Sequence, residues 1–460
     1  MKNAVSYFVI IVVSFCFLFG TASARKRIRK LPVSAYIKSA KIEIVSGDPE
    51  RYKTAVAMLD SLFMHYGHHA EGLFLMAQMM VDGIVTSSGP VAKTPYVEMM
   101  VAYIDTLHMC CENKDIKDDY REDCDKFIQQ MDSISVKYWR EFYNAGVEQL
   151  GKIDGFQKDL KATPDSSMKV YLENGLQANF DSSLINLKLA IKIDPDDDRS
   201  YIGIATAYEK VEDFKNSIEW KTKALKLTKD SSSLLLSIGY NYINMEEFCE
   251  AIPYLKAIVD DAPDDLTNMY NLTICYNNCE MYDSAMVYYD KILKIDSNNT
   301  DVLSAVGRYY NEMGRQAADS ARNYEQAGNT KPAKEWRAKK DESFDSSRVY
   351  FRKAFESNPE DEFIADMYGI VCAIDGEYEE AITAFAKLTE INPGNSGYWT
   401  SLGDCHLNLR HFDESIIAYE KVVELDPSNS KVWQQLKDLY HEKGNTAKET
   451  EAKKHLDQLN

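Results

Sequence analysis

The sequence has 460 residues, of which 45% are hydrophobic, with only 21 glycines and 12 prolines. This composition predicts a folded chain and excludes a disordered one. A formal net charge of −19 repels nucleic acid and anionic lipid, so we expect no nucleic-acid partner. The length suits two or three ordinary domains or one long array of repeats.

The first 24 residues have the layout of an export signal. An apolar run from Val5 to Phe19 precedes the small residues 22–24 of a cleavage site. The run is shorter than the roughly 20 residues that a spanning helix needs. We therefore expect residues 1–24 to be a signal peptide. The chain is expected to be exported, periplasmic or secreted, with no stable membrane insertion after cleavage. Basic residues at 25–30 resist translocation, so an uncleaved membrane anchor stays open as the alternative.

A period of 34 residues organises the chain from Asp198 onward. Small side chains recur at the eighth and twentieth positions of the period, where two antiparallel helices can cross closely. The eighth position holds Ala205, Gly239, Thr273, Gly307, Gly369, Gly403 and Lys437. The twentieth position holds Ser217, Ala251, Ala285, Ser347, Ala381, Ser415 and Glu449. This pattern predicts pairs of helices that bury their apolar faces by stacking on neighbouring pairs.

Two segments, YWTSLGDCHLNLRHFDESIIAYEKVVELDPSN and FIADMYGIVCAIDGEYEEAITAFAKLTEINPGN, resemble the tetratricopeptide repeat family nearly column by column. The resemblance implies an all-α fold, a right-handed superhelical solenoid of antiparallel helix pairs. We expect about nine or ten helical pairs. It also implies a protein that binds other proteins or peptides and is not an enzyme.

The regular array is expected over residues 198–460, ending in a polar, solvent-facing cap. Residues 139–197 read as an interrupted repeat, with helices at 139–150 and 181–195 and an insertion between them. Residues 25–138 read as a divergent helical region, in which one copy spans 36–69 and a second, starting at Ala70, is interrupted by TSSGPVAKTP.

Two insertions break the period. The stretch around 315–346 is rich in alanine and charged residues, which predicts a projecting helical hairpin with its tip near Asn329. Residues 151–177 contain glycine, proline and aspartate, which predicts a short helix plus a loop.

In this family the first helices of successive repeats line a concave groove. The resemblance therefore implies a groove formed by Leu236, Tyr240, Ile243, Asn244, Tyr270, Ile274, Asn277, Asn278, Arg308, Asn311, Phe363, Asp366, Ile370, Thr400, Asp404 and Asn408. Such aromatic, aliphatic and amide side chains suit a bound peptide. We expect an extracytoplasmic adaptor or assembly scaffold. The alternatives are a structural protein that self-associates through the projecting hairpin and a membrane-anchored cytoplasmic adaptor.

No catalytic constellation stands out, and we expect no cofactor. His65, His68 and His69 lie at an expected turn between helices, where imidazoles are usually solvated, so no metal site is expected. A disulfide from Cys110 or Cys111 to Cys124 would join two helices across a charged loop, with unpaired thiols as the alternative. Stacking of repeats makes a Cys249–Cys279 bridge plausible, and two buried thiols are the alternative.

Overall fold

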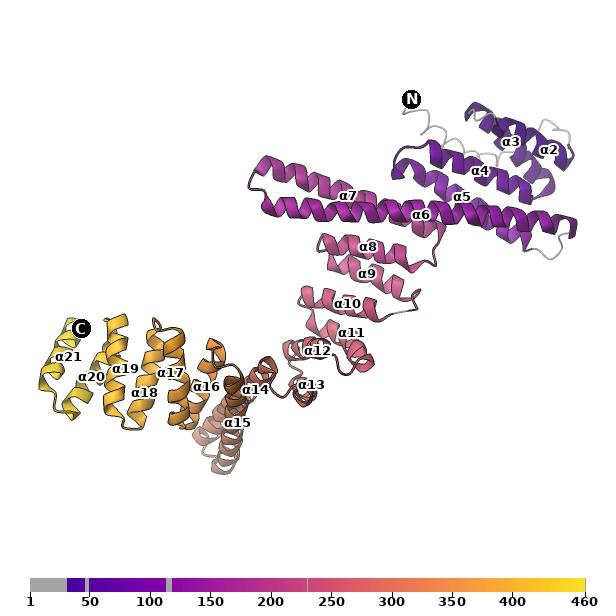
Figure 1. The fold of residues 1–460 in the computed structure, drawn as a ribbon. Helices are drawn as coiled ribbons and strands as arrows, with labels where there is room; N and C mark the ends of the chain where they lie inside the picture. The colour runs from indigo at the N-terminus through magenta and orange to yellow at the C-terminus, as the bar shows by residue number, and fades with distance from the viewer. Residues whose placement is uncertain (1–30, 46–48, 113–117, 230, 460) are drawn as a thin grey trace. The chain divides into compact units, whose positions relative to one another are not determined.

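A computed structural model describes residues 31–45, 49–112, 118–229 and 231–459 of the chain. These residues form 20 helices, and the described ranges contain no strand. The chain divides into two compact units, Met1–Met245 and Glu246–Asn460. Figure 1 shows the helices following one another as antiparallel neighbours within each unit. The predicted all-α solenoid of helix pairs is thereby confirmed.

Unit 1 consists of four helix pairs followed by a single helix. The pairs are α2–α3, α4–α5, α6–α7 and α8–α9, and α10 packs against α9. The helices are α2 (Val33–Val45), α3 (Pro49–Tyr66), α4 (Ala70–Thr86), α5 (Pro90–Cys111), α6 (Asp118–Ala162), α7 (Ser166–Ile193), α8 (Asp198–Lys210), α9 (Phe214–Leu225) and α10 (Ser232–Asn244).

Unit 2 begins with α11 (Phe248–Asp261), which packs on the first of five helix pairs. Its pairs are α12 (Leu266–Asn278) with α13 (Tyr282–Ile295), α14 (Thr300–Gln326) with α15 (Thr330–Ser357), α16 (Glu362–Asp375) with α17 (Tyr378–Ile391), α18 (Ser396–Asn408) with α19 (Phe412–Leu425), and α20 (Ser430–Glu442) with α21 (Thr446–Leu459). Helix α21 buries only Ala452 among its described residues.

Small residues of facing helices meet inside three of the described helix pairs, α6–α7, α14–α15 and α18–α19. In each of these pairs, a serine hydroxyl donates a hydrogen bond to a glycine carbonyl of the facing helix. These bonds are Ser183 to Gly146 at 3.0 Å, Ser347 to Gly307 at 2.7 Å and Ser415 to Gly403 at 2.9 Å. A β-carbon on Gly403 would lie only 2.6 Å from the ring of Tyr419. The eighth position is therefore small because an aromatic ring of the second helix covers it.

Several first helices start at a capping side chain, and several are followed by a left-handed residue. Asp197, Asp265 and Asp361 accept a hydrogen bond from the backbone three residues on, as N-caps do. From α8 onward, the turn into the second helix has a positive φ in seven places, at Glu212, Glu246, Glu280, Gly328, Gly376, Arg410 and Gly444. The sequence does not reveal this turn position, because glycine occupies it only three times.

The stretch 151–177 is not the short helix plus loop that its glycines and proline suggested. Helix α6 runs through Gly151 and Gly155 to Ala162, and α7 starts at Ser166. The ring of Phe156 lies over Gly175, where a β-carbon would come within 2.4 Å of it. Glycine weakens a helix by about 1 kcal/mol, and this close packing between α6 and α7 offsets that cost. The expected first helix at 139–150 likewise begins earlier, at Asp118.

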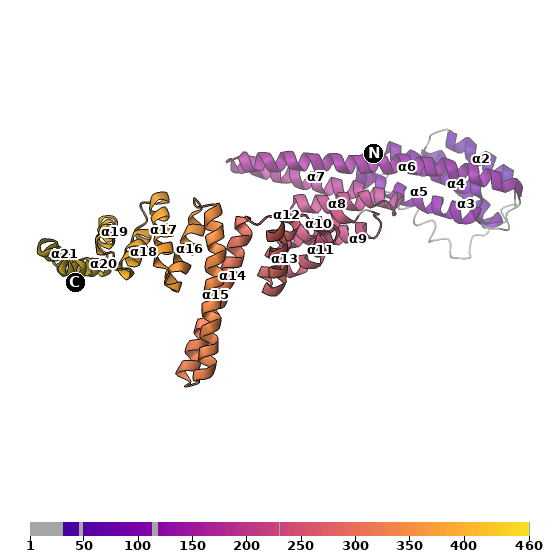
Figure 2. The ribbon, with the colours of Figure 1, turned by 60° about the horizontal axis from the view of Figure 1, so that its bottom comes forward.

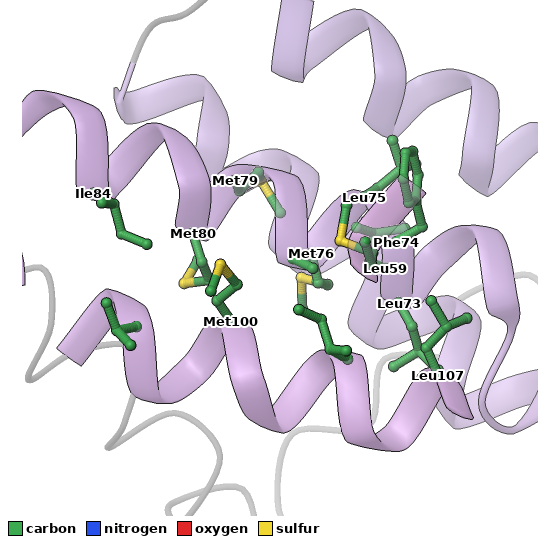
Figure 3. Packing of buried hydrophobic residues seen from close by; sticks show 14 of the residues in the cluster. Leu59, Leu73, Phe74, Leu75, Met76, Met79, Met80, Ile84, Met100 and Leu107 are labelled. Carbon is green, nitrogen blue, oxygen red and sulfur yellow. The ribbon is translucent and has the colours of Figure 1, made fainter. Parts of the chain in front are cut away.

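The N-terminal part of unit 1 is held by a methionine-rich core. Met76, Met79 and Met80 of α4 lie opposite Met100 of α5, and all four are nearly inaccessible to solvent (Figure 3). The interruption expected within TSSGPVAKTP is only the short turn 87–89, since α5 begins at Pro90. Proline is well suited to that first helical position because its missing N–H would have no partner there.

Candidate protein-binding face

The side chains expected to face a groove lie on first helices in both units. Leu236, Tyr240 and Ile243 of α10 are half-buried and Asn244 is exposed, all within unit 1. The remainder lie on α12, α14, α16 and α18 of unit 2. The four α10 residues therefore belong to a different compact unit from the other expected residues.

Helix α12 contributes Tyr270, Ile274 and Asn277, which are half-buried, and Asn278, which is exposed. The side-chain amide of Asn277 donates to the hydroxyl of Tyr289, and that of Asn278 donates to the Ile274 carbonyl at 2.9 Å. Burial raises the pKa of Tyr270, as does the nearby charge of Asp301. Each of the two asparagine amides thus already has one partner within the chain.

Helix α14 places a cation and an incompletely bonded amide on this face. Arg308 is exposed, and its guanidinium lies 5.7 Å from the ring centroid of Phe363 on α16, within the range of a cation–π contact. The Oδ1 atom of Asn311 and the hydroxyl of Ser304 are buried without a hydrogen-bond partner among the described residues. Buried acceptors of this kind are rare in folded proteins.

Helix α16 presents a stripe of apolar side chains to solvent. Phe363 is 48% exposed, Ile370 is 37% exposed and Ile374 is 55% exposed. Their spacing of seven and four residues places them on one side of the helix. Ile374 occupies the same column of the repeat as Asn244 and Asn278, so the column pattern could have found it. Asp366 lies beside the stripe, and burial, with a smaller effect of Glu362, raises its pKa.

Helix α18 is tied to α16 and to its own repeat. The hydroxyl of Tyr398 donates to Glu362 at 2.9 Å, and burial together with this bond raises the pKa of Tyr398 to about 12. Asp404 accepts a hydrogen bond from the hydroxyl of Tyr419. Thr400 and Asn408 donate to carbonyls of α18 itself. These polar groups mainly hold the repeat together.

The tetratricopeptide repeat family pattern matches residues 396–429, which form the α18–α19 pair. The α18–α19 pair is therefore identified as a tetratricopeptide repeat. Arrays of tetratricopeptide repeats serve as interaction scaffolds, because stacked first helices create an extended binding surface. No curated protein matches the sequence significantly.

Several solved repeat structures are similar to parts of this chain. The C-terminal part of a TPR repeat-containing protein from Cytophaga hutchinsonii is 15% identical, with a TM-score of 0.39, covering 56% of this chain and 95% of that chain. A tetratricopeptide repeat protein from Parabacteroides merdae is 13% identical, with a TM-score of 0.31, covering 64% and 99%. YrrB, described as a TPR protein with an unusual peptide-binding site, is 15% identical, with a TM-score of 0.23, covering 54% and 96%. At these TM-scores the similarities do not bear on function.

Four of the five cysteines considered for disulfides are paired in the structure. Cys111 is bonded to Cys124 and Cys249 to Cys279, each pair with its Cα atoms 5.6 Å apart. The first bond joins α5 to α6, and the second joins the start of α11 to the residue that ends α12. Cys110 is a free thiol, 3.5 Å from the carbonyl of His68, and burial raises its pKa.

His65, His68 and His69 lie around the turn between α3 and α4. The ring of His65 lies near Tyr36, and that of His68 lies edge-on to Phe63 at 5.8 Å. Burial lowers the pKa of His69. His68 and His69 also line a cavity of about 810 Å³ between α2, α4, α5 and α6. Among the described residues, no group of three or more potential ligands could hold a metal ion.

None of the helices within the described ranges is both long and apolar enough to span a bilayer. The apolar run at 5–19 and the basic residues at 25–30 lie outside the described residues.

Proposed function

We propose that the chain is a non-enzymatic, extracytoplasmic adaptor whose unit 2 binds a peptide segment of a partner protein. The binding face consists of the α16 stripe, which is Phe363, Ile370 and Ile374, together with Arg308 and Asn311 of α14. The observation that carries this proposal is the exposure of the stripe, between 37% and 55% for each side chain. Contiguous exposed apolar side chains with a polar rim are typical of interaction sites.

The polar groups beside the stripe favour a peptide over a small apolar molecule. The apolar stripe would accept apolar side chains of a bound segment. Arg308 stands at one end of the stripe, where it would attract an acidic side chain of the partner. An apolar and acidic segment, extended or helical, meets both requirements.

The two disulfides support the extracytoplasmic part of the proposal. Disulfides persist in secreted and periplasmic proteins and are rare in the reducing cytosol. The signal layout of residues 1–24 agrees with that location. N-terminal sequencing of the protein from its native cells tests it directly. A chain that starts at Arg25 would support export, and a chain that retains residues 1–24 would contradict it.

Peptides selected from a phage-displayed random library against the purified chain test the binding face. We expect the Phe363→Ala, Ile370→Ala double variant to bind the selected peptides at least about tenfold more weakly, measured by fluorescence anisotropy, because buried anchors dominate binding energy. The matched control is Val287→Ala with Ile417→Ala, two side chains of second helices that are 55% and 61% exposed.

Equal losses in the two double variants would overturn the assignment of the face to α16. Selected peptides whose binding is unchanged by Phe363→Ala and Ile370→Ala would overturn it as well. Circular dichroism of each variant separates loss of binding from loss of fold.

A further inference from the structure

The α14–α15 hairpin extends well beyond the other helices of unit 2. Helices α14 and α15 have 27 and 28 residues, whereas neighbouring α16 and α17 have 14 each. At 1.5 Å per residue, the excess corresponds to roughly 20 Å of projecting hairpin. Figure 2 shows this projection, and the turn at its tip is formed by residues 327–329.

The end of this hairpin is basic, although the chain as a whole is acidic. Residues 322–340, which we call the basic tip, contain six basic and two acidic side chains in a protein of net charge −19. Arg337 pairs with Glu325, and Lys339 lies 4.4 Å from the ring centroid of Trp336. Lys331 and Lys334 are exposed and form no ion pair within the described residues.

The basic tip lies at the start of a helix. A helix N-terminus carries partial positive charge, so acidic residues stabilise its first turn and cations destabilise it. The first turn of α15 contains Lys331 and no acidic residue. In the same unit α14, α16 and α17 have at least one acidic residue there, whereas α12, α18 and α20 have none. The side chains of the tip and the helix end therefore contribute charge of the same sign.

The same unit contains a surface of opposite character. Asp260 and Asp261 are the last two residues of α11, where partial negative charge disfavours carboxylates. With Asp264 they form an exposed group that we call the acidic turn, and no described lysine or arginine pairs with it. The acidic turn thus combines carboxylates with a helix C-terminus, just as the basic tip combines cations with a helix N-terminus.

We propose that the basic tip of one copy docks on the acidic turn of a second copy of this chain. The two surfaces are complementary in both side-chain charge and helix-end polarity, and each lacks a full set of partners within the chain. The contact joins two different surfaces, so it is heterologous and builds open chains of molecules rather than closed dimers. It is separate from the peptide-binding face of α14 and α16 and goes beyond the function proposed above.

Sedimentation velocity of the purified chain tests this contact. We expect association at an ionic strength of about 0.02 M and dissociation at about 0.5 M, since screening weakens contacts between charged surfaces. Two triple variants should each associate at least about a hundredfold more weakly, because they place like charges opposite each other. The tip variant is Lys331→Glu, Lys334→Glu, Arg337→Glu, and the turn variant is Asp260→Lys, Asp261→Lys, Asp264→Lys.

Mixing the two variants provides the decisive measurement. The reversed tip of one variant then faces the reversed turn of the other, so the mixture should associate although neither variant does alone. The matched control is Lys158→Glu, Lys161→Glu, Lys169→Glu at the end of the α6–α7 hairpin, which makes the same charge change at three exposed lysines and should leave association intact.

Three outcomes would overturn the proposal. The first is a wild-type chain that stays monomeric at low ionic strength, including one that instead binds vesicles containing phosphatidylserine. The second is association that survives the tip variant, and the third is failure of the mixed variants to associate. Loss of fold is not expected to obscure the result, because acidic residues in the first turn of α15 stabilise that helix, and circular dichroism checks this.

Discussion

Each unit contains one long helical hairpin, and the two differ in how their ends are built. Helix α7 starts at Asp165, whose carboxylate accepts hydrogen bonds from the backbone N–H groups of Ser167 at 2.7 Å and Met168 at 3.1 Å. Helix α15 starts at Asn329 without such a bond. The helices α11, α13, α17 and α19 likewise start without a side-chain capping bond. The comparison teaches that an uncapped start is common in unit 2 and that α15 is distinguished by the cations that follow it.

The surfaces of the two ends differ as well. Near the end of α6–α7, Met168 is 47% exposed, Val170 is 56% exposed and Tyr171 is 66% exposed. The charges of residues 151–177 are balanced, with four basic and four acidic side chains. The end of α14–α15 is instead dominated by lysine and arginine. Contacts at the first end would persist at high salt and contacts at the second would not.

The hairpins are also anchored by different means. Helix α6 is linked covalently to α5 through Cys124 and Cys111. Helix α15 is held to the following repeat by Arg348, which lies 3.0 Å from Asp375, and by Arg352, which pairs with Glu380. The hydroxyl of Tyr368 donates to Glu380 at 2.7 Å. Reductant should therefore weaken the attachment of α6, and acid should weaken the attachment of α15.

The largest effect is expected from removing the covalent anchor. Cys111→Ser with Cys124→Ser should lower the free energy of unfolding by about 3 kcal/mol, because the bond closes a loop of 13 residues. Hydrogen exchange should rise at the start of α6 and stay unchanged in α15. Equal loss of protection in the two hairpins would show that the anchors are not independent.

A smaller effect is expected from the ionic anchor. Glu380→Gln should cost about 1–2 kcal/mol in urea unfolding, because Arg352 loses a charged partner in a partly buried site. Burial alone would raise the pKa of Glu380, but hydrogen bonds from Arg352 and Tyr368 and the charge of Arg348 bring it below its usual value. A depressed carboxylate pKa stabilises the fold above the unfolded pKa of about 4.3.

This contribution is therefore lost as the pH falls below about 4, through the lowered pKa of the folded state. Loosening of α15 in acid should be visible by hydrogen exchange and absent in Glu380→Gln, which has no carboxylate to protonate. If wild type and Glu380→Gln responded identically to acid, titrating groups other than Glu380 would be responsible for the response.

The smallest effect concerns the helix starts. Asp165→Ala should speed amide exchange at Ser167 and Met168 by roughly fivefold, the effect typical of losing an N-cap. Asn329→Ala should change exchange at the start of α15 by much less, because Asn329 makes no capping bond. Similar changes at the two sites would contradict the difference between the hairpin ends.

The sequence predicted the helix pairs because their contact depends on residue size at fixed positions. Gly403 and Ser415 could be placed opposite each other from the period alone. The hydrogen bond between them could not, because it depends on how the Ser415 side chain is rotated. The left-handed turns were missed because Glu212 and Arg410 carry no sign of that conformation in their residue type.

The sequence predicted which repeat positions could form the candidate site, but it did not predict which of their side chains are exposed. Phe363 and Ile370 fall in the expected columns and are exposed, whereas Asp404 in the same pattern bonds to Tyr419. Which of these side chains remains available depends on neighbours from the second helix. The stretch 151–177 was misread because local glycine content outweighed the packing of Phe156, a contact between residues distant in sequence.

The Cys249–Cys279 bond has a mechanical consequence for unit 2. Arrays of helix pairs behave as springs, since each pair can rotate slightly on the next. The bond fixes the start of α11 to the end of α12, so this step cannot stretch or twist freely, while later steps are held by side-chain packing and ion pairs. A pulling force on unit 2 would therefore separate the helix pairs from α12 to α21 first. The distance between the start of α11 and the end of α12 would stay unchanged.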